Sequence, residues 1–156
     1  MKNKSACKKA LRLFLLTAFL FLLSCSARTE PEGVWNLREK MINLAVSLTG
    51  VPYKYGGLDI EGFDCSGFVH YVYDCFGIEL PRSAKTMSKI KGKIKLNNAQ
   101  PADILVFKLR RIWHAAIYLG DNMFIHSPNR GGTVRTEQLT DYWKSRLKTV
   151  LRVLND

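Results

Sequence analysis

The sequence predicts an α+β fold in which helices from the first half of a domain pack on an antiparallel sheet of about five to six strands from the second half. Two observations indicate this order. Between residues 34 and 48 the apolar residues recur at the spacing of an amphipathic helix. After Gly92 they fall instead into short runs separated by turn-forming residues, which is typical of strands.

Three helices are expected before the sheet. The first covers residues 34–48 and ends at Thr49-Gly50-Val51-Pro52, where glycine and proline interrupt the helical pattern. The second follows a glycine-rich loop and begins near Asp64 or Cys65. It ends at Gly77, because glycine is common directly after a helix.

A third, short helix begins after Pro81-Arg82-Ser83, and Ser83 is expected to be its N-cap. A further short helix near Leu139–Lys144 interrupts the last connection between strands. The segments expected to form strands are Lys93–Leu96, Ile104–Lys108, His114–Leu119, Met123–Ser127, Thr133–Thr136 and Val150–Leu154.

Residues 1–24 have the layout of an export signal. Five basic residues precede an apolar run of 11 residues, Leu13 to Leu23. Spanning a bilayer takes about 20 apolar residues, so we expect no permanent transmembrane helix here. The segment ends in Leu22-Leu23-Ser24-Cys25, which resembles the lipobox of bacterial lipoproteins, and Cys25 is the expected site of lipid attachment. An ordinary signal peptide followed by an unmodified cysteine is the alternative.

We therefore expect a lipoprotein signal peptide at residues 1–24, a lipidated cysteine with a short tether at 25–33, and one domain at 34–156. Removing the signal leaves 132 residues and lowers the net charge from +11 to +6. Such an excess is expected to form a solvated face in an exported protein, rather than a nucleic-acid site. Much of it lies in one run of lysines: Lys85, Lys89, Lys91, Lys93 and Lys95.

The two cysteines within residues 62–77, GFDCSGFVHYVYDCFG, are expected to differ in chemistry. If Asp64 caps the helix, the Cys65 thiol lies in the first turn, where the helix dipole and free N–H groups stabilise a thiolate. Gly62 and Gly67 are expected to leave room for a substrate carbonyl. Cys75 lies about 15 Å further along the helix, and a disulfide needs Cα atoms within roughly 7 Å. The pair therefore cannot bridge, and Cys75 is expected to be an inert core residue.

A thiolate nucleophile needs a base, usually histidine, that a third polar group orients. Of the three histidines, His70 lies in the same helix as Cys65 and is expected to be structural. His114 and His126 flank a hairpin that turns at residues 120–122. A two-residue loop would place them on opposite faces, whereas a three-residue loop makes them direct or diagonal neighbours on one face. We predict the three-residue loop, with Gly120 or Asn122 in a left-handed conformation.

In that register His114 can accept the proton of Cys65 while His126 fixes the tautomer of His114. Two other interpretations of these three residues stay open. They are structural, or they are zinc ligands, although no CxxC or HExxH spacing supports a metal. We expect no metal and no cofactor.

With these residues in place, the sequence resembles the NlpC family of bacterial cell-wall cysteine peptidases, a branch of the papain-like fold. The likeness runs from about Val34 to Leu154. Because five blocks occur in the family's order, the resemblance is more specific than any single motif. The blocks are VPYKYGG with GFDCSGFVHYVY, then LPRSA, PADILVF, WHAAIYLGD and FIHSP.

The resemblance implies that Cys65 is the nucleophile, His114 the general base and His126 the orienting residue. It also implies that the hydroxyl of Tyr53 helps the Cys65 backbone N–H to stabilise the oxyanion, although Tyr53 could instead only pack the loop. The residues that it implies for substrate binding are Asp64, Ser66, Arg82 and Ser83. For Asp64 and Ser83 the alternative is a helix cap, and for Arg82 it is a solvated side chain.

The function that the resemblance implies is a peptidoglycan endopeptidase, anchored by lipid at Cys25, which hydrolyses amide bonds in stem peptides or cross-links through a thioester. We expect it to be exported to the cell envelope, on the outer membrane facing the periplasm in a Gram-negative cell. We expect a monomer with no nucleic-acid partner. Two other functions use the same features: an acyl or amide transferase with the same thiol, and a non-catalytic wall-binding lipoprotein.

Overall fold

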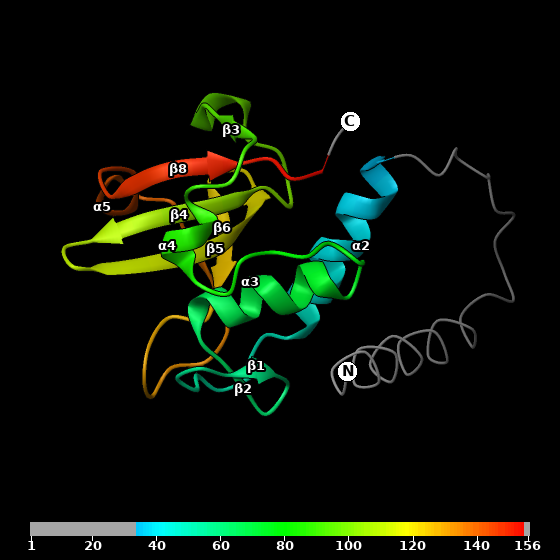
Figure 1. Ribbon diagram of the computed structural model, residues 1–156, viewed down its shortest axis with the longest axis vertical. Helices are drawn as coiled ribbons and strands as arrows, with labels where there is room; N and C mark the ends of the chain where they lie inside the picture. The colour runs from blue at the N-terminus through cyan, green and yellow to red at the C-terminus, as the bar shows by residue number, and fades with distance from the viewer. Residues whose placement is uncertain (1–33, 155–156) are drawn as a thin grey trace, which may run out of the picture.

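The computed structural model describes residues 34–154 and has the α+β architecture that the sequence predicts (Figure 1). The expected export signal, Cys25 and tether lie outside the described residues. No helix in the described range is long and apolar enough to span a membrane. The elements are α2 (Val34–Ser47), β1 (Leu58–Asp59), β2 (Gly62–Phe63), α3 (Cys65–Asp74), α4 (Ala84–Met87), β3 (Lys93–Ile94), a 3-10 helix (Leu96–Asn98), β4 (Ile104–Leu109), β5 (Ile112–Gly120), β6 (Met123–His126), β7 (Arg135–Gln138), α5 (Asp141–Lys144) and β8 (Leu147–Leu151).

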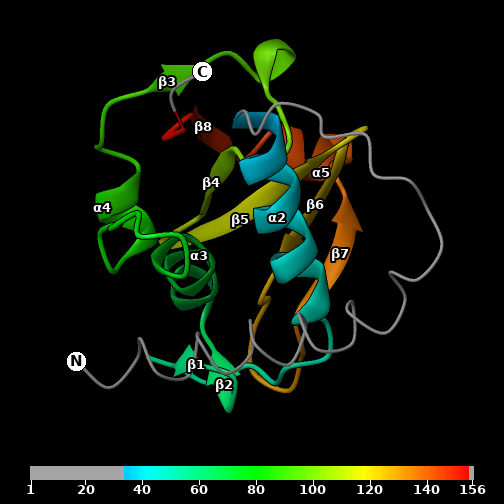
Figure 2. The same ribbon diagram turned by 90° about the vertical axis from the view of Figure 1, so that its right-hand side faces the viewer.

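A six-stranded antiparallel sheet in the order β3-β8-β4-β5-β6-β7 forms the centre of the fold. Helices α2 and α3 lie on the same side of this sheet, and α3 packs against β5 (Figures 1 and 2). The last strand, β8, lies between β3 and β4 and pairs with both, so β3 and β7 are the edge strands. β1 and β2 form a separate small hairpin next to α3.

All six predicted strands are present, and their ends differ from the prediction. The last one covers residues 147–151 rather than 150–154, because its first residue already pairs with β4 at Phe107. β7 covers residues 135–138 rather than 133–136. The loop predicted at residues 53–62 contains the short hairpin of β1 and β2.

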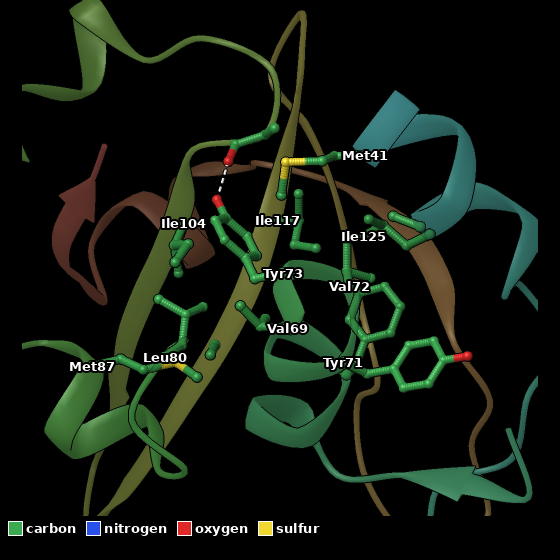
Figure 3. Close-up of a cluster of buried hydrophobic side chains, with 14 of the residues drawn as sticks. Met41, Val69, Tyr71, Val72, Tyr73, Leu80, Met87, Ile104, Ile117 and Ile125 are labelled. Carbon is green, nitrogen blue, oxygen red and sulfur yellow. Dashed lines mark hydrogen bonds between the residues drawn. The ribbon is translucent and has the colours of Figure 1, made fainter. Parts of the chain in front are cut away.

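The two faces of the sheet have separate apolar cores. On the helix side, α2, α3 and α4 pack against alternate residues of β4 and β5 (Figure 3). Tyr73 lies within this layer, and its hydroxyl donates a hydrogen bond to the carbonyl oxygen of Ala102 just before β4. On the other face, Phe107 and Phe124 pack with Trp143 of α5. Alternation along β5 places His114 on this second face.

A buried ion pair connects α2 to the start of β4. Arg38 and Asp103 are each 1% exposed, and the Arg38 guanidinium donates to the Asp103 carboxylate at 3.1 Å. Arg38 also donates to the carbonyl oxygen of Pro101 at 2.8 Å. Arg152 donates to the second carboxylate oxygen of Asp103 at 3.0 Å. Charged groups at this depth need such partners, so the network fixes α2 against the sheet.

Candidate active site

The register of the β5–β6 hairpin is the one that brings the two histidines together. In this register the numbers of two paired residues add up to 242. His114 and His126 are therefore diagonal neighbours on one face of the sheet, as predicted. The pairs that define this register are Ile117 with Ile125 and Tyr118 with Phe124.

The prediction of a three-residue loop is wrong. The strands are joined by two residues, Asp121 and Asn122, both at positive φ as in a type I′ turn. Gly120, also at positive φ, pairs with Met123. If the register of this pair continued along the strands, the two histidines would lie on opposite faces of the sheet. A bulge at Leu119 inserts one extra residue and restores the register in which they share one face.

His114 and His126 form a hydrogen bond in an apolar layer. Nε2 of His114 lies 2.7 Å from Nδ1 of His126, and Phe107 and Trp143 pack against the His114 ring. Burial, followed by the neighbouring His126, lowers the pKa of His114 to about 3. Burial lowers the pKa of His126 to about 4, although the charge of Glu137 opposes this shift. Both rings are therefore neutral at neutral pH, and one donates its proton to the other.

Glu137 on β7 extends this contact to a third side chain. Its Oε1 lies 3.2 Å from Nε2 of His126. The N–H direction departs from the line to this oxygen, so the carboxylate attracts the N–H dipole of the neutral ring without forming a straight hydrogen bond. Arg135 donates to Oε1 at 2.6 and 2.8 Å, and the Trp143 indole N–H donates to Oε2 at 3.0 Å. Burial would raise the pKa of Glu137, but Arg135 and His126 outweigh it and lower the pKa.

The sequence-based prediction did not include Glu137. His126 pairs with Arg135, so the residue two positions further along β7 lies diagonally across from His126 on the same face. A strand predicted two residues later would have placed the Glu137 carboxylate beside the histidine. The position of β7 was therefore the missing signal.

Cys65 is the first residue of α3, and Asp64 caps the helix as predicted. β6 pairs with β5 from Ile117 onward, which leaves the preceding edge of β5 to the N-terminus of α3. The Cys65 Sγ lies 4.0 Å from the carbonyl oxygen of Trp113, and the N–H of Ala115 is directed to the sulfur. The thiol thus lies at the backbone on both sides of His114.

The Cys65 thiol is protonated at rest, which corrects the expectation of a thiolate. Burial is the largest effect and raises the pKa of Cys65, and the negative charge of Asp64 adds to it. The N–H groups of Ala115 and Ser66 lower the pKa without compensating for burial. Attack by the sulfur therefore needs a base that removes the proton.

Cys65 is a free cysteine, as expected. Cys75 lies half-buried at the end of α3 against the helix-side core and is disulfide-bonded, so the expectation of an inert core thiol is wrong. The expected role of Gly62 and Gly67 is wrong, since a Cβ atom at Gly62 would lie 2.5 Å from the Cβ of Lys54. A Cβ atom at Gly67 would lie 2.0 Å from the carbonyl oxygen of Gly57. The glycine therefore lets the loop before β1 pack on α3 and does not make room for a substrate.

Tyr53 is half-buried on the segment that precedes β1. Its N–H donates to the carbonyl oxygen of Gly132 at 2.8 Å. Burial raises the pKa of the Tyr53 hydroxyl, and the nearby charges of Cys65 and Asp64 raise it further, while Arg130 opposes them. The hydroxyl therefore keeps its proton at neutral pH, as a hydrogen-bond donor to an oxyanion must.

Three of the four predicted substrate-binding residues form one network beside Cys65, which we call the Asp64 corner: Asp64, Ser66 and Arg82. Arg82 donates to the two carboxylate oxygens of Asp64 at 2.9 and 2.6 Å and to the Ser66 hydroxyl at 3.1 Å. Asp64 also accepts hydrogen bonds from the N–H groups of Gly67 and Gly56 at 2.7 and 3.1 Å. Burial would raise the pKa of Asp64, but Arg82 and these donors outweigh it and lower the pKa.

Ser83 does not join the Asp64 corner. It is exposed and caps α4, where its hydroxyl accepts a hydrogen bond from the Thr86 N–H at 3.2 Å. His70 has the structural contact expected of it, since Nδ1 lies 3.0 Å from the carbonyl oxygen of Leu80. Within residues 34–154, no three His, Cys, Asp or Glu side chains are grouped in a way that could hold a metal ion.

Comparison with known proteins assigns the chain to a family. The model of the NlpC/P60 family matches residues 50–152. A probable endopeptidase of Haemophilus influenzae is 31% identical over 160 residues, which cover 93% of this chain and 99% of that protein. The murein DD-endopeptidase MepS/murein LD-carboxypeptidase of Escherichia coli K12 is 30% identical over 122 residues, covering 77% and 65%.

The fold has close relatives among solved structures. The crystal structure of an NlpC/P60 family protein from Bacillus cereus superposes with a TM-score of 0.72 at 30% identity, covering 76% of this chain and 40% of that one. Other curated relatives are much longer, and the chain spans 27% of one from Mycobacterium tuberculosis and 37% of one from Bacillus subtilis. The family match extends from just before the loop of Tyr53 to the end of β8, and the chain therefore belongs to the NlpC/P60 family, as its sequence motifs indicate.

Proposed function

We propose that this protein is a cysteine peptidase that hydrolyses amide bonds in the stem peptides or cross-links of peptidoglycan. The observation that carries the proposal is the buried hydrogen bond between His114 and His126, beside the edge of β5 where α3 delivers Cys65. A free thiol next to a neutral, oriented imidazole is what nucleophilic catalysis by cysteine requires. The activity in the name of the Escherichia coli relative supports murein, that is peptidoglycan, as the substrate.

The proton positions follow from the contacts on β6 and β7. Glu137 is ionised, because its pKa is lowered, and attracts the N–H at Nε2 of His126. Nδ1 of His126 is then the acceptor, and it accepts the proton on Nε2 of His114 across 2.7 Å. This leaves Nδ1 of His114 unprotonated. We assign this nitrogen as the base that takes the proton of Cys65.

The reaction then runs in two halves. As the sulfur of Cys65 bonds to the substrate carbonyl carbon, the thiol proton moves to His114, and the carbonyl electrons form an oxyanion. The oxyanion accepts hydrogen bonds from the Tyr53 hydroxyl and the Cys65 backbone N–H. His114 protonates the leaving amine as the C–N bond breaks, which leaves a thioester. Water, deprotonated by His114, attacks the thioester and releases the acid and the thiol.

The Asp64 corner supports a role in substrate binding. Asp64 and Ser66 hold the guanidinium of Arg82, whose side chain stays 39% exposed. We assign the exposed part of Arg82 to a carboxylate of the stem peptide, because a guanidinium recognises a carboxylate through paired hydrogen bonds. In this assignment Asp64 and Ser66 position Arg82, and Ser83 lies at the margin of the site.

Export and anchoring form a separate part of the proposal. The basic and apolar pattern of residues 1–24 supports export, and the lipobox-like end supports lipid attachment at Cys25. The family's substrate lies in the cell envelope, which is where such an anchor would hold the domain. Labelling of growing cells with palmitate tests the anchor, since the label must disappear from a Cys25→Ala variant.

Digestion of purified muropeptides, followed by mass analysis of the products, tests the activity. We expect one amide to be replaced by a free acid and a free amine, and we expect Cys65→Ala to be inactive. Cleavage by Cys65→Ala at the parent rate would contradict the mechanism. A product in which an amine has joined the acyl group would instead indicate a transferase. Binding without any new product would indicate a non-catalytic wall protein.

A further inference from the structure

One end of the sheet carries a concentration of positive charge that the catalytic mechanism does not use. We call it the basic end, and it is formed by the β4–β5 hairpin tip, α5 and the start of β8. The three segments meet because Phe107 pairs with Leu147 and the Lys108 N–H donates to the carbonyl oxygen of Arg146 at 2.9 Å (Figure 1). Its basic residues are Lys108, Arg110, Arg111, Lys144, Arg146 and Lys148.

The basic end is unbalanced in charge. The two stretches that build it, residues 106–113 and 141–149, contain six basic residues and one acidic residue, Asp141, a net charge of +5. No ion pair within the described residues involves Arg110 or Arg111, and both side chains are exposed at the hairpin tip. An anionic partner that neutralises this excess of positive charge gains free energy.

Aromatic rings organise part of this surface. The Lys108 ammonium lies 4.4 Å from the centroid of the Trp113 ring, and the Arg146 guanidinium lies 3.8 Å from that of Tyr142. Such contacts hold a cation in place and lower the entropy that a partner must remove on binding. Ile112 is 68% exposed and Tyr142 is 55% exposed, so the basic end also offers apolar contact area.

The basic end borders the candidate nucleophile. The ring of Trp113 is in contact with the Lys108 ammonium, and the carbonyl oxygen of the same residue lies 4.0 Å from the Cys65 sulfur. A polymer bound along the hairpin would therefore pass next to the reacting thiol. A flat bilayer would meet the same cations but would close off this edge of β5 from a wall substrate, so the geometry favours a polymer.

We infer that the basic end is an exosite that holds the peptidoglycan strand through its stem-peptide carboxylates while Cys65 acts on one peptide. This inference rests on the proposed function. A strand presents many carboxylates and a single muropeptide only a few, so the contribution of the exosite must depend on polymer length. It must also fall as salt rises, because exposed charges are screened at a Debye length of about 8 Å in physiological salt.

The test compares two substrates that contain the same scissile bond, intact peptidoglycan and a soluble muropeptide. In Arg110→Gln/Arg111→Gln we expect kcat/KM on intact peptidoglycan to fall about 3- to 10-fold at low salt, with the muropeptide rate within about twofold of the parent. High salt must bring the parent down to the variant. Lys89→Gln/Lys91→Gln is the control, because it removes the same charge from exposed residues beside β3, which pairs with the opposite end of β8.

Four outcomes separate this inference from the proposed function. A loss confined to intact peptidoglycan and absent from the control supports the exosite. An equal loss on both substrates, or an equal loss in the control, overturns it. The inference is also overturned if Arg110→Gln/Arg111→Gln digests intact peptidoglycan at the parent rate but no longer binds vesicles of anionic phospholipid that the parent binds. The surface would then serve a membrane. If the parent cleaves neither substrate, the proposed function itself fails.

Discussion

Two regions flank Cys65, and they solve the problem of buried polar groups in opposite ways. The histidine layer, formed by His114, His126 and the aromatic rings around them, removes the charge: burial lowers both histidine pKa values until the rings are neutral. The Asp64 corner keeps its charge and surrounds it with donors, so the pKa of Asp64 is lowered in spite of burial.

The difference assigns separate tasks to the two regions. A neutral imidazole pair can exchange a proton with a thiol at little electrostatic cost, which suits a general base. A carboxylate with five hydrogen bonds is fixed in position and fixes the start of α3, where Cys65 lies. At neutral pH, substitutions in the histidine layer should therefore affect mainly the rate, and loss of Asp64 should affect mainly the stability.

The largest expected effect is the loss of the base. His114→Gln keeps a polar side chain in the layer but cannot accept the thiol proton. We expect kcat to fall about 10³- to 10⁴-fold, the usual range for loss of a general base in a nucleophilic site. The free energy of unfolding at neutral pH, measured by urea denaturation, should change by much less than the activation free energy that this loss of rate represents. A variant with full activity would place the base elsewhere.

The next largest effect is the loss of stability in acid. An unfolded histidine binds a proton near pH 6.5, whereas His114 and His126 stay neutral down to about pH 3 and 4. The unfolded chain therefore binds more protons in this window, and stability falls as the pH drops through it. Between about pH 7 and about pH 4.5 we expect a loss on the order of 2–5 kcal/mol.

Urea denaturation across this pH range measures the effect. The double variant His114→Gln/His126→Gln is its control and should have a much flatter profile, because the two titrating groups are gone. Asp64 and Glu137 contribute below this window, since their pKa values are lowered from those of ordinary carboxyl groups. A parent profile as flat as that of the double variant would show that the histidines are not protected from protons.

The Asp64 corner provides the third prediction. Asp64→Ala removes the cap of α3, the acceptor for Gly56 and the partner of Arg82. We expect the free energy of unfolding to fall by about 1–3 kcal/mol, a value that includes about 1 kcal/mol for the cap and discounts Arg82 for its exposure.

Asp64→Asn is the matched variant for this prediction. It keeps a capping oxygen and loses the charge, so its loss in urea denaturation should be clearly smaller. Equal losses in the two variants would show that the charge, and not the cap, determines the stability of this corner.

A smaller effect is expected from Glu137. Glu137→Gln keeps an acceptor for the Trp143 indole but loses the negative charge that attracts the N–H of His126. We expect kcat to fall about 10-fold, or about 1.4 kcal/mol, with KM unchanged, because the tautomer of His126 is less firmly set. Arg135→Gln leaves the carboxylate in place and should change kcat by less than about twofold. An unchanged kcat in Glu137→Gln would remove Glu137 from the mechanism.

Local features of this fold could be predicted from the sequence, and features that join distant segments could not. Asp64 and Ser83 were recognisable as caps because a cap depends on residues three positions away. The ion pair of Asp64 with Arg82 spans 18 residues, and no periodic pattern reports it. The contact of Glu137 with His126 depended on a two-residue shift of β7, which lies within the ordinary error of strand ends.

The hairpin turn shows a different kind of limit. The requirement that His114 and His126 share a face gave the correct register, because side chains alternate strictly along a strand. It could not distinguish a three-residue loop from a two-residue loop with a bulge. Both place one extra residue between the paired parts of the two strands, so both put the histidines on one face. The protonated state of Cys65 was also out of reach, because burial is set by the whole fold.

The smallest expected effect concerns Ser83, and it sharpens the boundary of the Asp64 corner. The resemblance implies a substrate contact for Ser83, whereas its observed contacts are those of an N-cap on a four-residue helix. Ser83→Ala should lower the free energy of unfolding by about 0.5–1 kcal/mol, the lower range for a cap, and change kcat/KM on muropeptides by less than about twofold. Ser83→Asp is the matched variant, because an aspartate caps as well as a serine and should restore stability. If Ser83→Ala instead loses about 10-fold in kcat/KM with its stability intact, Ser83 touches the substrate, and the binding site extends beyond Arg82 along α4.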